Sequence, residues 1–249
     1  MPRRRQDRGG TISVTVVMMK LLLLPPIGND IGCWRWLAAR EARPHLYPGH
    51  GQRPQSMTLA ELADDAIAVE EGEVDLLGVA MGGVIAQHIL LRHPDRVRSA
   101  VLACTSGRSD SKALLARAEA AETRGMAAVT SSTLERWFTP NALAQPEHPG
   151  VAYARASLLG VDPYALGDAW RALATHDVID QLGGVRAPVT VVAGTEDTTT
   201  PVSRIESLQT RIPGSRMELL PGPHMIHLEE PDQLRALLER HLAWVESRS

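Results

Sequence analysis

The chain has 249 residues, of which 44% are hydrophobic and 22% are charged, as in an ordinary globular protein. These values exclude disorder or a fibrous repeat along the whole chain, and the length suits one large α/β domain or two small ones. A formal net charge of −3 gives no case for a nucleic-acid partner. Two cysteines, Cys33 and Cys104, are too few for a disulfide framework and favour a reducing, cytoplasmic environment.

The N-terminal segment combines a basic stretch with an apolar one. We expect residues 1–10 to form a loose basic tail. The run Val14–Leu24 superficially resembles a secretory signal, but Lys20 interrupts it, Pro25 and Pro26 follow it, and no cleavage pattern of small residues is present. The run is also too short to span a membrane. Its β-branched first half and the turn signal at its end predict a buried strand.

Strand and helix patterns then alternate along the chain. Further strands are predicted at Arg43–Tyr47, Val74–Val79, Arg98–Ala103, Pro188–Gly194 and Met217–Leu220. Helices are predicted around Trp34–Arg40 and at Thr58–Glu70, Gly82–Arg92 and Asp232–Glu246, and Thr58 with Glu61 has the spacing of a capping box. Such alternation predicts an α/β fold in which a mostly parallel sheet carries helices on both faces.

The alternation is interrupted in the middle of the chain. Residues 109–174 show no strand pattern and consist of helical stretches rich in Ala, Leu and Arg that prolines divide. We therefore expect an α/β core built from residues 1–108 and 175–249, with a helical lid formed by residues 109–174. Such a lid would lie over the carboxyl ends of the strands, where open α/β sheets bind ligands.

A short motif follows the strand predicted at Val74–Val79. Residues 76–86 read Leu-Leu-Gly-Val-Ala-Met-Gly-Gly-Val-Ile-Ala, which is the strand, sharp turn and helix of a nucleophile elbow, G-x-S-x-G, with Ala80 at the nucleophile position. Asp197 comes after a later strand, and His224 follows in Pro-Gly-Pro-His. The order of elbow, acid and histidine is the chain order of an α/β-hydrolase triad.

On these motifs the chain resembles the α/β-hydrolase superfamily over nearly its whole length, and it is most similar to small hydrolases of the 3-oxoadipate enol-lactonase type. The segments that carry the resemblance are Gly78–Gly83, His93–Val97, Arg124–Met126, Glu135–Pro140, Gly194–Asp197 and His224–Pro231. The resemblance implies that Asp197 is the acid and His224 the base, and that a helical lid covers a small-molecule pocket.

Three departures separate the chain from this pattern. Ala80 offers no oxygen that could attack a carbonyl. Pro25-Pro26 replaces the His-Gly pair of a loop that supplies one oxyanion-hole amide, so the candidate amides are those of Ile27 and Met81. The hairpin that precedes the first core strand in such hydrolases is nearly missing, because about a dozen residues come before Val14.

Aromatic side chains are scarce and concentrate in the predicted lid. Trp137 and Trp34 are expected as opposite walls of the pocket, with Phe138 and Tyr153 as further substrate-binding candidates. A mainly apolar pocket of this kind would suit a cyclic ester or a related natural-product-like molecule. The histidines do not have the spacing of zinc ligands, so no metal or other cofactor is predicted. His227 is interpreted as a structural histidine, and His50 as a brace for its loop.

Three accounts of Ala80 stay open at this point. In the favoured one, the enzyme is a lyase in which His224, oriented by Asp197, abstracts a proton and eliminates a carboxylate from a small lactone or acylated ester. In the second, the natural residue is serine and the chain is an inactivated esterase or lactonase. In the third, the chain is a binding protein on a hydrolase fold. We expect a small-molecule substrate and no membrane partner, and the sequence leaves a monomer and a homo-oligomer equally open.

Overall fold

The computed structural model describes residues 20–37, 42–47 and 57–248. Its centre is a six-stranded sheet in the order β2-β1-β3-β4-β5-β6, and every neighbouring pair is parallel. The strands are β1 (Leu21–Leu24), β2 (Ala42–Pro44), β3 (Val74–Val79), β4 (Val97–Ala103), β5 (Val189–Gly194) and β6 (Arg216–Leu220). The predicted α/β-hydrolase fold is confirmed.

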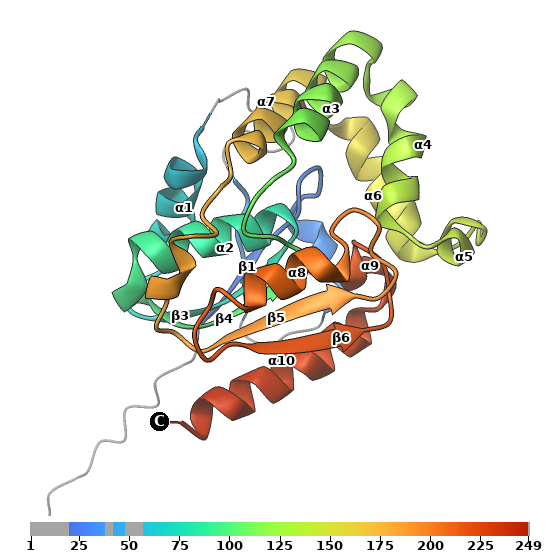
Figure 1. The fold of residues 1–249 in the computed structure, drawn as a ribbon. Coiled ribbons are helices and arrows are strands. Elements are labelled where there is room, and N and C mark those ends of the chain that lie inside the picture. The colour runs from blue at the N-terminus through green and yellow to red at the C-terminus, as the bar shows by residue number, and fades with distance from the viewer. Residues whose placement is uncertain (1–19, 38–41, 48–56, 249) are drawn as a thin grey trace, which may run out of the picture.

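Helices lie on both faces of the sheet and form a separate group beyond one end of it (Figure 1). In the core these are α1 (Leu59–Ala68), α2 (Met81–Arg92), α8 (Val202–Gln209), α9 (Ile226–Glu229) and α10 (Pro231–Glu246). The helical insertion between β4 and β5 consists of α3 (Ser111–Arg124), α4 (Met126–Trp137), α5 (Pro140–Leu143), α6 (Pro149–Gly160) and α7 (Pro163–Ala174). Three short 3₁₀ helices complete the described elements: η1 (Ile31–Trp34), η2 (Pro94–Arg96) and η3 (Leu182–Gly184). No helix in these ranges is long and apolar enough to cross a membrane.

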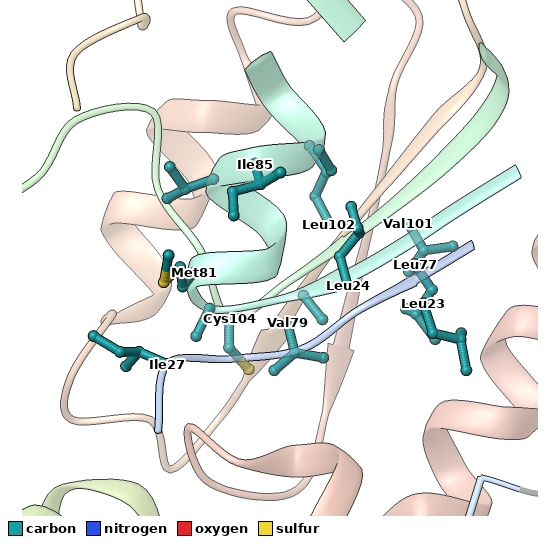
Figure 2. Close-up of a cluster of buried hydrophobic side chains, with 14 of the residues drawn as sticks. Leu23, Leu24, Ile27, Leu77, Val79, Met81, Ile85, Val101, Leu102 and Cys104 are labelled. Atoms are coloured by element: carbon teal, nitrogen blue, oxygen red, sulfur yellow. The ribbon is translucent and has the colours of Figure 1, made fainter. Parts of the chain in front are cut away.

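The central strands are mainly apolar and buried because the sheet is covered on both faces. β1 is four consecutive leucines, all buried, and β3 is buried at every position. Figure 2 shows labelled side chains of β1, β3 and β4 on both sides of these strands, in one buried cluster with Ile85 of α2. The register pairs Leu24 with Gly78 and Val79 with Ala103, so these strands end side by side and their following loops meet.

Most predicted elements are found, and their boundaries differ where local side-chain chemistry intervenes. The predicted capping box is confirmed, since Thr58 N donates to Glu61 Oε2 at 2.8 Å and Glu61 N donates to Thr58 Oγ1 at 3.2 Å. The first strand is confirmed at Leu21–Leu24, whereas residues 1–19 and the loop containing His50 lie outside the described residues.

The helix predicted around Trp34–Arg40 is wrong as far as it is described. Instead, residues Ile31–Trp34 form η1, and residues 38–41 lie outside the described part. Asp30 caps this turn by accepting a hydrogen bond from Gly32 N at 2.7 Å.

Candidate active site

The turn between β3 and α2 is a strained elbow centred on Ala80. Ala80 has φ 50° and ψ −112°, and it is one of two non-glycine residues with positive φ in the described ranges. Such a conformation costs about 1–3 kcal/mol and persists only where the surrounding structure enforces it. Here the enforcement comes from Ala80 N, which donates to Ala103 O at 2.9 Å, and from Val84 N, which donates to Ala80 O at 3.1 Å.

The elbow also needs two glycines, because backbone segments approach each other closely on either side of it. A Cβ on Gly78 would lie 2.3 Å from Gly82 O, and a Cβ on Gly82 would lie 1.9 Å from Leu24 O. Only hydrogen fits at these positions. The small residues recognised in the sequence motif are therefore required by the packing of the turn.

His224 and Asp197 form a buried pair beside the elbow. The Nδ1 atom of His224 lies 2.8 Å from Asp197 Oδ2, and both side chains are buried. The other carboxylate oxygen, Oδ1, accepts hydrogen bonds from Thr199 N and Thr200 N, each at 2.8 Å. These amides fix the carboxylate, and the carboxylate fixes the tautomer with a proton on Nδ1. His224 Nε2 is thereby left as the acceptor, and within the described residues it makes no hydrogen bond.

A cavity of about 140 Å³ joins this pair to the elbow. Of the residues singled out in the sequence, Ala80, Met81, Ile27, Trp137 and His224 line it. Figure 2 shows Ile27, Met81 and Cys104 gathered around the turn at the end of β3. The core supplies one side of the cavity, and α3, α4 and α7 of the insertion supply the other through Leu114, Arg117, Trp137, Trp170 and Leu173.

The end of α4 is fixed to the loops that carry the histidine and the acid. Met225 N, next to His224, donates to Trp137 O at 3.0 Å. Thr199 Oγ1, two residues after Asp197, donates to Arg136 O at 2.9 Å. The backbone carbonyls of Arg136 and Trp137 at the end of α4 therefore bind the loops of Asp197 and His224. These contacts hold Trp137 at the cavity.

The structure places three predicted substrate-binding residues outside the cavity lining. Trp34 is buried behind the site, where its ring lies 5.1 Å from that of His227. Tyr153 donates a hydrogen bond to Asp30 Oδ1 at 2.6 Å and so braces the loop before η1. Phe138 packs edge-on against His148. The sequence shows where these aromatic residues lie along the chain. It does not show the direction of each side chain, which depends on tertiary packing.

Other cavity residues were not predicted as site residues. Arg117 and Trp170 face the cavity from α3 and α7, and Thr199 and Thr200 face it from the acid loop. The threonines directly follow the acid in sequence, so a carboxylate that needs backbone donors could have pointed to them. Arg117 carried no signal, because an arginine in an Ala- and Leu-rich helix is by default a surface residue.

Two further buried side chains near the pair are electrically neutral. Burial, with a smaller contribution from His224, lowers the pKa of His227 to about 3. Burial, followed by the charge of Asp197, raises the pKa of the Cys104 thiol well above its ordinary value. Cys104 lines the cavity but is held as a thiol, so it is a poor nucleophile. Within the described ranges, no group of three His, Cys, Asp or Glu side chains could hold a metal ion.

Comparison with known proteins finds similar chains among hydrolases and esterases. Residues 21–237 match the alpha/beta hydrolase family. The chain is 26% identical over 219 residues to 3-oxoadipate enol-lactonase 1 of Acinetobacter baylyi, covering 83% of this chain and 82% of that protein. It is 29% identical over 223 residues to a pimeloyl-acyl-carrier-protein methyl ester esterase of Aromatoleum aromaticum, covering 81% and 87%. A crystal structure of a hydrolase from Pseudomonas aeruginosa PA01 superimposes with a TM-score of 0.84 at 28% identity, covering 90% of this chain and 89% of that one.

Proposed function

The chain belongs to the alpha/beta hydrolase family, and from that premise we propose that its cavity binds a small ester or lactone whose hydrolysis is the reaction the site is built for. The observation that carries this proposal is the elbow itself. Ala80 keeps the strained backbone of a nucleophile position in a cavity that it shares with His224. The similar proteins with named activities, an enol-lactonase and a methyl ester esterase, act on the same class of bond.

The strain at Ala80 supports this assignment because a methyl group gains nothing from it. A positive φ at a non-glycine residue raises the free energy of the fold, and it is retained where it aims a reacting side chain. A hydroxyl at position 80 would project into the cavity that His224 lines. Ester hydrolysis therefore explains the strained turn at Ala80 better than the lyase reaction that the sequence favoured, because the lyase reaction does not use a side chain at that position.

With alanine at position 80, the chain is left with water as the attacking group. In the proposed reaction, His224 Nε2 takes a proton from a water molecule as its oxygen adds to the carbonyl carbon. The tetrahedral intermediate then collapses, the bond to the leaving oxygen breaks, and that oxygen receives the proton from His224. Amides of Met81 and Ile27 are assigned to the developing oxyanion. General-base catalysis of this kind contributes roughly 10²–10⁴-fold, which suits only activated esters such as aryl esters and enol lactones.

A second candidate keeps the same base but needs no nucleophile. Elimination of a carboxylate after proton abstraction by His224 would be unaffected by the loss of serine, and the intact pair of His224 with Asp197 favours it. The replacement of the usual His-Gly pair by Pro25-Pro26 also fits a site no longer adapted to acyl transfer. The two candidates differ in what a hydroxyl at position 80 would do.

The discriminating variant is Ala80→Ser, assayed on small aryl esters and on enol lactones. We expect kcat/KM to rise by at least about 100-fold, because a covalent nucleophile replaces water. Ala80→Ser combined with His224→Ala should lose the gain, and Ala80→Gly, which keeps the elbow without a hydroxyl, should show none. If Ala80→Ser gives no gain while the unaltered chain turns over a substrate in a reaction that requires His224, the elimination reaction is the correct assignment.

A further inference from the structure

A second cavity of about 150 Å³ lies wholly within the helical insertion, between α3, α4 and α7. Its floor is formed by small and apolar side chains, among them Ala121, Val129 and Leu166. Three arginines, Arg117, Arg124 and Arg136, line the same space. Arginine is expected on a helix surface, but three guanidinium groups around one small cavity are not explained by solvation alone.

None of these arginines is paired with an acid in the described residues. No carboxylate oxygen lies within 4.0 Å of their guanidinium groups, whereas Arg171 of the same insertion pairs with Glu122. Arg136 Nη2 donates to the hydroxyl of Thr133 at 2.9 Å, and Arg117 lies 5.3 Å from the ring of Trp170. Hydroxyl and ring contacts position the cations without neutralising them.

Charge and burial act against one another at this cavity. Burial, and then the charge of Arg117, lower the pKa of Arg136 to about 10. Burial lowers the pKa of Arg117 as well. The nearest opposing charges are those of Asp110 on Arg117 and Glu135 on Arg136, and both are weaker than the effect of burial. Desolvated cations without a counter-ion are costly, and a ligand that supplies the counter-ion offsets that cost.

Arg117 and Trp170 line both this cavity and the one that contains Ala80 and His224. The two spaces therefore adjoin, with Arg117 and Trp170 at their boundary. We propose that the cavity between α3, α4 and α7 binds an oxyanion, a carboxylate or a phosphate, carried at the far end of the ester or lactone that reacts beside His224. Guanidinium groups suit this chemistry because their paired N–H donors match two oxygens of one anionic group. The inference rests on the proposed function and narrows its substrate to an anionic one.

A titration tests the oxyanion site without relying on catalysis. The unaltered chain is titrated with inorganic phosphate and, separately, with glutarate by calorimetry at low ionic strength. We expect saturable binding of at least one of them, weakened at least about tenfold in Arg136→Gln and in Arg117→Gln. Arg155→Gln, which removes an exposed arginine of α6 that lines neither cavity, is the matched control and should bind as the unaltered chain does. Absence of saturable binding below about 10 mM, or equal weakening in Arg155→Gln, would overturn the proposal.

A second measurement tests whether the oxyanion belongs to the substrate. In the Ala80→Ser background, kcat/KM is compared for a nitrophenyl ester of butyrate and for the matching monoester of glutarate, which ends in a carboxylate. The preference for the anionic ester should fall at least about tenfold in Arg136→Gln and stay unchanged in Arg155→Gln. An unchanged preference in Arg136→Gln overturns the link to the substrate. If the Ala80→Ser background proves inactive, the proposed function fails, and the titration still decides the oxyanion site.

Discussion

At the scale of single residues, the site is defined by what surrounds Ala80. The glycines on either side, the positive φ and the anchored Asp197 carboxylate are all present, and the side chain at position 80 is a methyl group. The turn at Ala80 and the proximity of Asp197 to His224 could be predicted from the sequence because their motifs have a fixed order and local turn chemistry. Trp34 and Tyr153 could not be assigned in this way, because burial and hydrogen bonding turn their side chains away from the cavity.

Several buried histidines make the stability of the fold depend on pH. Burial lowers the pKa of His241 to about 4, that of His176 to about 4 and that of His227 to about 3. In the unfolded chain these groups titrate near the ordinary histidine value of about 6.5. Below that pH the unfolded state binds protons that the folded state excludes, so the free energy of unfolding falls as the solution is acidified.

We therefore predict that the free energy of unfolding decreases between pH 7 and pH 5, by up to about 1.4 kcal/mol per pH unit for each such histidine. His241→Gln should make this slope shallower, because one proton-binding group is removed from the unfolded chain. The variant also loses the 2.8 Å hydrogen bond to Thr190, so it should be less stable at neutral pH. Urea unfolding at a series of pH values measures both quantities. A slope that is the same in His241→Gln and in the unaltered chain would contradict the assignment.

At the scale of secondary-structure elements, the sequence predicted the central strands and the main helices well. Apolar runs identify β1 and most of β3, and the capping box identifies the start of α1. The helix predicted around Trp34–Arg40 was wrong as far as it is described, because the turn η1 at Ile31–Trp34 ends where that helix was expected to begin. Close contacts between elements, such as that of α2 with β1, are not encoded in any one segment and emerge only from the assembled fold.

The contact between α2 and β1 gives a sharp prediction about stability. Gly82→Ala would place a Cβ 1.9 Å from Leu24 O, which is backbone and cannot move without shifting β1. We expect a loss of roughly 3 kcal/mol or more in the free energy of unfolding, as for overpacking of a rigid core.

Gly160→Ala is the matched control, because a Cβ at this position would have no other atom within 4 Å and the φ of Gly160 is not positive. At the end of α6 this change should leave stability equal or slightly raised, by up to about 1 kcal/mol. Denaturant midpoints of the two variants provide the comparison. Similar midpoints for Gly82→Ala and Gly160→Ala would contradict the prediction, because they would show that β1 shifts to accommodate the added Cβ at little cost in stability.

At the scale of the whole molecule, the core and the insertion build the site together. The core contributes the elbow and the pair of His224 with Asp197, and the insertion contributes Trp137, Trp170 and Arg117. Hydrogen bonds from Met225 N and Thr199 Oγ1 to the end of α4 couple the two parts. The fold and the existence of a helical insertion were predictable from alternating patterns, whereas the arginine-lined cavity depends on how α3, α4 and α7 pack.

We propose that position 80 is the nucleophile position of an ester-hydrolysing site with His224 as its base. Labelling with a fluorophosphonate, followed by intact-protein and peptide mass spectrometry, tests it most directly. We predict one covalent adduct at position 80 in Ala80→Ser, and none in the unaltered chain or when His224→Ala is added. A correctly folded Ala80→Ser protein that takes up no label, or one labelled equally well without His224, would contradict the claim.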